Sequence, residues 1–298
     1  MYYGVTIMSI DVGIKKGYLK IVGSKVQYLA AKKEYNFTDP EEKVRARFYV
    51  DLIENYQYLP SRIDVEVYSP RREPKLPADI VVFEDDAREH RFIVVETKAT
   101  SAKNQIDEAK REGLGNATLL DAKFLVIYCN EQKIVFNVEK KPPLDKLDNY
   151  VVADIPVKYG KIPKYKFKRG DPKWDLRRTN LSELSNKFQL CHDEIWEGGK
   201  RDPAVAFDEM SKLMFAKIYD ERFTPTGEHY QFQVGTYENP LEVAQKVSEL
   251  YIKAQEKFHI LASFVAQAKR YAPLINMQMP IIPKITVNRE SMCPKALA

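Results

Sequence analysis

Two nearly continuous apolar runs, Ala78–Phe83 and residues 92–95, constrain the fold of this chain more than any other feature. A strand covered on both faces loses the alternation of apolar and polar residues, so both runs predict central strands of a sheet. The turn-prone segment 84–88 joins them. The two strands are therefore expected to form an antiparallel pair.

The segments before this pair carry their own signals. Residues 18–22 and 25–30 flank Gly23-Ser24, which predicts a tight hairpin. A helix is expected to start at Asp39-Pro40, because aspartate caps a helix and proline fits its first turn. Residues 63–67 alternate between apolar and polar, as in a half-buried strand.

The segments after the pair complete a mixed α/β core. A polar helix is predicted over residues 102–113, followed by strands at 124–129 and 134–138. The order is helix, three strands, helix, two strands, within just over a hundred residues. This order predicts a mixed central sheet with helices packed against it.

The pattern changes after Pro142-Pro143. A poorly periodic region runs to about residue 180, and the rest is helical, with a capped start at Asp202-Pro203 and a long helical pattern over 241–271. We therefore predict an α/β domain over residues 1–140, a basic linker over 141–180 and an α-helical domain over 181–298.

Positive charge is concentrated in residues 156–178. This segment holds nine lysines and arginines against two aspartates, a net charge of +7, whereas the whole chain carries +5. Basic residues interleaved with aromatic ones can neutralise phosphates and stack on bases. The candidate DNA-binding residues are Lys164, Lys166, Lys168, Arg169, Arg177 and Arg178. A solvated linker kept soluble by its lysines is the alternative.

Several classes of protein do not fit the sequence. No apolar run approaches the ~18–20 residues of a membrane span, and the first ten residues lack the pattern of a signal peptide. Three widely spaced cysteines argue against a disulfide framework. We expect a cytoplasmic protein with no membrane contact.

Three polar residues flank the two central strands. Asp79 opens the first strand, and Glu96 and Lys98 close the second. In an antiparallel pair the start of one strand lies beside the end of the next, so Asp79 is expected next to Glu96. Side chains alternate along a strand, which places Glu96 and Lys98 on one face and points Thr97 away.

Two neighbouring carboxylates repel each other unless they are protonated or bridged by a cation, and oxygen ligands of this kind suit Mg²⁺, with Mn²⁺ as a substitute. A bound divalent ion activates water and offsets charge on a phosphodiester. Lys98 would then polarise the attacking water or stabilise the phosphate. The alternative is that Glu96 and Lys98 form a surface ion pair of little energetic weight.

Glu96-Thr97-Lys98 after a hydrophobic strand, with Asp79 17 residues upstream, resembles the motif of PD-(D/E)xK nucleases. Segments 40–45, 61–63, 78–80 and 94–98 are also similar to the N-terminal nuclease domain of type I restriction endonuclease subunits, over roughly residues 18–138. The resemblance implies a Mg²⁺-dependent deoxyribonuclease. It assigns catalytic positions to Asp79, Glu96 and Lys98, with metal ligands Asp79 and Glu96, a supporting acid at Glu42 and a helix glutamine at Gln105.

Residues 188–223 resemble the helical region that precedes the catalytic domain of N6-adenine DNA methyltransferases in restriction–modification systems. The sequence has neither an Asn-Pro-Pro-aromatic motif nor a phosphate-binding Gly-rich loop. The implied partners are double-stranded DNA and the methyltransferase and specificity domains or subunits of the same system. Two alternatives stay open: a catalytically silent DNA-binding or assembly module, and a nuclease that acts only inside a larger assembly.

Overall fold

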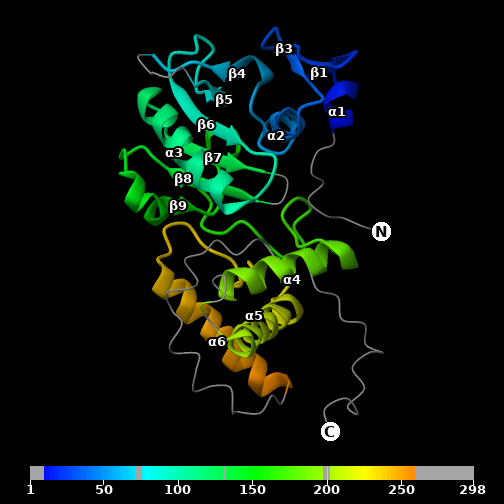
Figure 1. Ribbon diagram of the computed structural model, residues 1–298, viewed down its shortest axis with the longest axis vertical. Coiled ribbons are helices and arrows are strands. Elements are labelled where there is room, and N and C mark those ends of the chain that lie inside the picture. The colour runs from blue at the N-terminus through cyan, green and yellow to red at the C-terminus, as the bar shows by residue number, and fades with distance from the viewer. Residues whose placement is uncertain (1–9, 71–75, 130–131, 197–199, 201, 259–298) are drawn as a thin grey trace. The chain divides into compact units, whose positions relative to one another are not determined.

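A six-stranded mixed sheet forms the centre of the α/β part of the chain (Figure 1). The structure, a computed structural model, describes all residues except 1–9, 71–75, 130–131, 197–199, 201 and 259–298. The described chain divides into two units. The first contains residues 10–166 and Val234–Tyr237, and the second contains residues 167–233 and 238–258.

The strands of the sheet follow one another in chain order. They are β4 (Ile63–Val67), β5 (Ala78–Phe83), β6 (Arg91–Thr97), β7 (Phe124–Tyr128), β8 (Lys133–Asn137) and β9 (Val151–Val152). Neighbours run antiparallel except β6 and β7, which run parallel. The predicted antiparallel pair is confirmed as β5 and β6, with Ile80 opposite Val95. The mixed α/β core is likewise confirmed.

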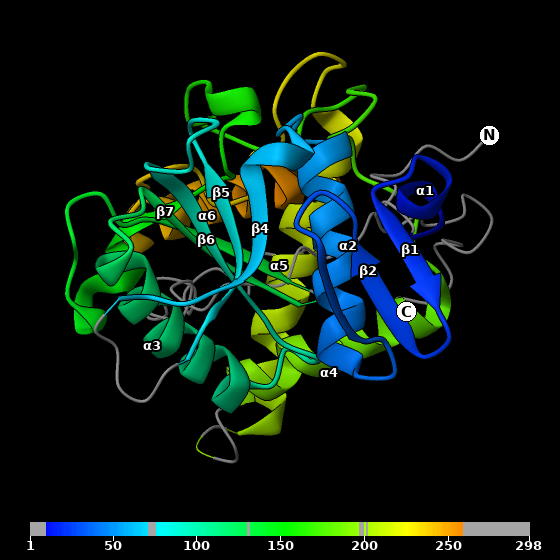
Figure 2. The same ribbon diagram turned by 90° about the horizontal axis from the view of Figure 1, so that it is seen from above.

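Two helices lie on opposite faces of this sheet (Figures 1 and 2). Helix α2 (Pro40–Glu54) begins where predicted, because the Asp39 side chain accepts a hydrogen bond from the Glu41 amide at 2.9 Å. Helix α3 (Lys103–Leu119) connects β6 to β7 and continues past the predicted end at Gly113. Its second half stays helical because Leu114 and Ala117 are buried against the sheet.

A smaller sheet precedes α2. The predicted hairpin is confirmed as β1 (Leu19–Val22) and β2 (Lys25–Tyr28), which turn at Gly23 with a positive φ of 60°. A third strand, β3 (Lys33–Asn36), pairs with β2 and was not predicted, because its alternating residues are half-buried or exposed and carry no apolar signal. A short helix, α1 (Ile10–Lys15), lies before the hairpin.

Residues 141–166 pack onto the first unit instead of forming a free connection. They include the 3₁₀ helices η2 (Leu144–Tyr150) and η3 (Val157–Tyr159) and the edge strand β9. Asp154 lies buried in this segment, where it accepts a hydrogen bond from the Tyr56 hydroxyl at 2.8 Å and pairs with Lys133 at 2.6 Å. The division between the units, after Lys166, therefore falls inside the predicted linker 141–180 and not at its ends.

The second unit is helical. It contains α4 (Leu181–Trp196), α5 (Pro203–Phe223) and α6 (Pro240–Phe258). Asp202 caps α5 as predicted, by accepting a hydrogen bond from the Ala204 amide at 2.7 Å. The predicted helix over 241–271 is found as α6, and its last part lies outside the described residues. None of the helices in the described ranges is long and apolar enough to cross a bilayer.

Candidate active site

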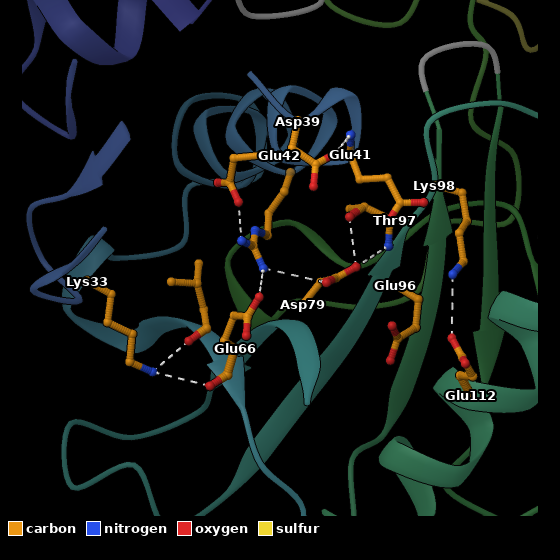
Figure 3. A network of polar contacts seen from close by, with 12 residues as sticks. Lys33, Asp39, Glu41, Glu42, Glu66, Asp79, Glu96, Thr97, Lys98 and Glu112 are labelled. Atoms are coloured by element: carbon orange, nitrogen blue, oxygen red, sulfur yellow. Dashed lines mark hydrogen bonds and ion pairs between the residues drawn. The ribbon is translucent and has the colours of Figure 1, made fainter. Parts of the chain in front are cut away.

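The start of β5 and the end of β6 meet at one edge of the sheet, which we call the rim (Figure 3). The register that places Ile80 opposite Val95 brings Asp79 next to Glu96. Asp79 and Glu96, the acid pair, are close enough that the charge of Asp79 contributes to raising the pKa of Glu96. The chain thus folds so that two carboxylates meet where the sequence predicted them.

Both oxygens of Asp79 have contacts. Its Oδ2 accepts hydrogen bonds from the Thr97 amide at 2.6 Å and from the Thr97 hydroxyl at 2.7 Å. Its Oδ1 lies 3.6 Å from Nη1 of Arg45. Burial raises the pKa of Asp79, although Arg45 and the two Thr97 donors oppose this shift.

Thr97 was expected on the opposite face from Glu96 and Lys98, but its hydroxyl contacts Asp79. Thr97 is the last residue of β6 and still pairs with Tyr128 of β7, but on the side of β5 it and Asp79 lie beyond the last register pair, Ile80 and Val95. Thr97 therefore serves as the donor that holds Asp79.

Glu96 is buried, with 5% of its surface exposed. Its Oε1 accepts a hydrogen bond at 2.8 Å from the side-chain amide nitrogen, Nδ2, of Asn116 on α3. Burial, together with the negative charge of Asp79, raises the pKa of Glu96 well above its usual range. A bound cation would relieve both effects, because it offsets the charge that burial disfavours.

Lys98 follows β6 directly and points toward α3 (Figure 3). Its ammonium lies 3.5 Å from Glu112 Oε2 and 3.9 Å from Glu108 Oε2, and 13% of its side chain is exposed. Burial alone would lower the pKa of Lys98, but the carboxylates of Glu112, Glu41 and Glu108 outweigh it and raise the pKa above its usual value. Lys98 is therefore an ammonium, and its ion-pair partners in the described structure are the acids of α3 and not Glu96.

Glu42 lies on the first turn of α2 and is 4% exposed. It accepts hydrogen bonds from the Tyr28 hydroxyl and from Nη2 of Arg45. The same guanidinium donates through Nη1 to Glu66 at 2.7 Å, lies beside Asp79, and stacks 4.4 Å from the ring centre of Tyr35. Glu42 is thus connected to the acid pair through Arg45.

Gln105 has a local role in the structure. Its Oε1 accepts hydrogen bonds from the Thr100 hydroxyl at 2.9 Å and the Thr100 amide at 3.3 Å. These contacts hold the turn that leads into α3, and the structure does not bring Gln105 into contact with the acid pair.

The six candidate DNA-binding residues differ in their surroundings. Lys166 forms an ion pair with buried Asp154 at 3.1 Å. Arg169 donates to the carbonyl oxygens of residues 221, 222 and 224, where α5 ends. Lys168 is half-buried, whereas Lys164, Arg177 and Arg178 are exposed. Two of the six side chains are therefore occupied by contacts within the protein.

Four residues of the rim were not identified from the sequence: Arg45, Thr97, Glu112 and Asn116. Each acts through contacts between elements that are separate in the chain. The one available signal is on α3, where Glu112 and Asn116 are spaced by one helical turn on either side of Gly113. A glycine inside a helix marks a close approach to a neighbouring element.

The rim offers two carboxylates to a metal ion. No group of three or more His, Cys, Asp and Glu side chains arranged for metal binding occurs in the part of the chain that the structure describes. The donor set of Asp79 and Glu96 nevertheless fits Mg²⁺, which is often bound by one or two carboxylates and completes its shell with water and substrate oxygens.

Residues 40–156 match the family model described as the type I restriction enzyme R protein N terminus. The match begins with α2, extends past β9 and covers less than half of the chain. It includes Glu42, Asp79, Glu96, Lys98 and Gln105. No curated protein matches the chain significantly. The segment that carries the acid pair therefore lies within the part of the chain that matches the type I restriction enzyme R protein N terminus.

Proposed function

We propose that this protein is a Mg²⁺-dependent endonuclease of the PD-(D/E)xK type that hydrolyses phosphodiester bonds of double-stranded DNA. The observation that carries the proposal is the acid pair: a buried carboxylate, Glu96, and a partly buried one, Asp79, at the end of adjacent strands, beside an ammonium, inside a restriction-enzyme domain. Such a pair is costly to keep ionised in a folded protein unless it binds a cation.

The proposed role of each site residue follows from the chemistry of its side chain. Asp79 and Glu96 would hold the metal, with Mn²⁺ as a possible substitute. When bound, a divalent ion lowers the pKa of a water ligand and offsets charge on the phosphate. Lys98, kept charged by the acids around it, would donate to a phosphate oxygen as negative charge develops there. Glu42 would support the site through Arg45, which lies beside Asp79.

The matched domain family also suggests the biological role of the protein and its partners. We infer a role in restriction–modification, in the cytoplasm, with double-stranded DNA as substrate and with methyltransferase and specificity domains or subunits as partners. The region over residues 181–298, which we predict to be a helical domain similar to the start of N6-adenine methyltransferases, would serve such contacts. Exposed Lys164, Arg177 and Arg178 remain candidates for binding the DNA backbone.

Nicking of supercoiled plasmid by the purified full chain in Mg²⁺ tests the proposal. Asp79→Asn, Glu96→Gln and Lys98→Met should each abolish nicking and leave the melting temperature nearly unchanged. Asp107→Asn removes one negative charge from an exposed position of α3 and should cut like the wild type. Equal nicking by the wild type and the three site variants would contradict the proposal.

A second candidate is a catalytically silent module that binds DNA or assembles with partners. It is favoured by the observation that both Asp79 oxygens already have contacts and that Lys98 is paired with α3. Calorimetry separates the two. Binding of Mg²⁺ or Mn²⁺ that is lost in Asp79→Asn supports the enzyme, whereas salt-sensitive DNA binding without metal uptake supports the silent module.

A further inference from the structure

One face of α3 reaches both site residues at the end of β6. Glu112 and Asn116 are four positions apart on the helix, so they lie on the same face. Glu96 and Lys98 are two positions apart along the strand direction. The two pairs match: Asn116 contacts Glu96 at 2.8 Å, and Glu112 lies 3.5 Å from Lys98.

The amide of Asn116 has a defined orientation. Its Oδ1 accepts a hydrogen bond from the Ser69 hydroxyl at 2.9 Å, so its NH₂ group is the end that faces Glu96. Asn116 is fully buried, so water does not compete for either bond. Ser69 and Asn116 together direct one oxygen of Glu96, Oε1, toward α3.

Gly113 allows the helix to come this close. A Cβ atom at this position would lie 2.7 Å from Cγ of Glu96 and 2.6 Å from Cδ1 of Leu125. The glycine thus sets the distance at which Glu112 and Asn116, on either side of it along the helix, can contact β6.

We propose that Asn116 and Glu112 are positioning residues of the active site, in which Asn116 orients the Glu96 carboxylate for the metal and Glu112 holds the Lys98 ammonium for the phosphate. The inference rests on the proposed nuclease function and adds that the two helix residues support different groups: Asn116 supports the metal ligand Glu96, and Glu112 supports Lys98. Asn116 donates to Oε1 of Glu96. Oε2 is the oxygen that the proposal assigns to the metal.

This division predicts that the two residues affect different steps. Loss of the Asn116 donor lets the Glu96 carboxylate rotate, which weakens metal binding. Loss of the Glu112 charge leaves the acid pair in place but releases Lys98, which slows the chemical step without changing metal affinity.

The test uses the full chain, with Mn²⁺ alone as the calorimetric probe and plasmid cleavage for kcat and KM. Asn116→Leu keeps the side-chain volume and removes the donor, and it should weaken Mn²⁺ affinity by about 10- to 100-fold, as outer partners of metal ligands do. Ser69→Ala should weaken it by a few-fold, because the amide is then no longer oriented. Asn104→Leu, the same change at an exposed position of α3, should have no effect.

Glu112→Gln should lower kcat by about tenfold or more while Mn²⁺ affinity and KM stay within about twofold of the wild type. Asp107→Asn, which removes one negative charge from the exposed side of α3, is its matched control and should change neither quantity.

The outcomes separate this inference from the proposed function. If the wild type takes up no Mn²⁺ and cuts no DNA, the nuclease assignment fails and the inference fails with it. If the wild type binds and cuts but Asn116→Leu and Ser69→Ala bind Mn²⁺ like the wild type, only the inference is overturned. If Asn116→Leu does not fold, Ser69→Ala decides. A Glu112→Gln variant that loses Mn²⁺ affinity as Asn116→Leu does would overturn the division of labour.

Discussion

Replacing Arg45 by methionine should destabilise the protein more than any other single charge removal at the rim. Only 6% of the Arg45 side chain is exposed, and its guanidinium donates to Glu42 and Glu66. Glu42 is 4% exposed on its side chain, so its carboxylate would be left inside the protein without its cation. The Tyr28 hydroxyl, its other partner, is neutral and compensates little of that charge.

The expected loss follows from this burial. Breaking a buried ion pair by removing one partner costs about 3–5 kcal/mol, because an uncompensated charge remains. Replacing both partners by neutral side chains is often close to neutral. Glu42→Gln combined with Arg45→Met should therefore be more stable than Arg45→Met alone by about 1–3 kcal/mol, even though it carries one substitution more.

Urea unfolding of the full chain, followed by circular dichroism, measures both quantities. Arg111→Met changes an exposed arginine of α3 and should stay within about 0.5 kcal/mol of the wild type. The reasoning is refuted if Arg45→Met loses less than about 1 kcal/mol. It is also refuted if the double variant is less stable than Arg45→Met, since Glu42 would then not be the charge left without a partner.

Three further predictions concern the acid pair and its helix. Asp79→Asn and Glu96→Gln each remove one of two neighbouring negative charges, so without metal their melting temperatures should be no lower than that of the wild type. Scanning fluorimetry should show that both lose the rise that Mn²⁺ gives the wild type. Burial and Asp79 raise the pKa of Glu96, so protons compete with metal, and calorimetric Mn²⁺ affinity should weaken as the pH falls. Affinity that does not weaken as the pH falls, over the range in which the protein stays folded, would contradict that pKa shift. Gly113→Ala places a methyl group against the sheet and should cost about 1–3 kcal/mol in urea unfolding. If Gly113→Ala is as stable as the wild type, α3 can move away from the sheet to make room for the methyl group, and the prediction is wrong.

The sheet and its acid pair were predictable because they depend on local sequence. Apolar runs identify β5 and β6, the short turn between them fixes their direction, and the direction alone places Asp79 near Glu96. The α2 start was also predictable, because the cap at Asp39 lies within the same few residues as the helix it starts.

The contacts that hold the site were not predictable, because each joins elements that are distant in sequence. Asn116 contacts Glu96 only because α3 packs across β6, and Arg45 reaches Asp79 from α2. Alternation along a strand gave no sign of the contact between Thr97 and Asp79, because Thr97 has no register partner in β5 and its amide and hydroxyl donate to the Asp79 side chain.

The basic segment shows the same difficulty for charge patterns. A run of lysines and arginines suggests DNA, but the sequence does not reveal which of them have internal partners. Lys166 pairs with Asp154, and Arg169 caps carbonyl groups at the end of α5, more than fifty residues away. Burial and partner distances are needed to separate such residues from exposed ones such as Arg177.

The position of a bound Mn²⁺ ion tests the central claim most directly. Crystals of the full chain soaked in Mn²⁺ should show one anomalous peak at the rim, with oxygens of both Asp79 and Glu96 as ligands. The same soak of Glu96→Gln should lack the peak. An ordered wild-type rim that carries no peak, or a peak bound elsewhere, would contradict the account of this site as a metal-dependent nuclease centre.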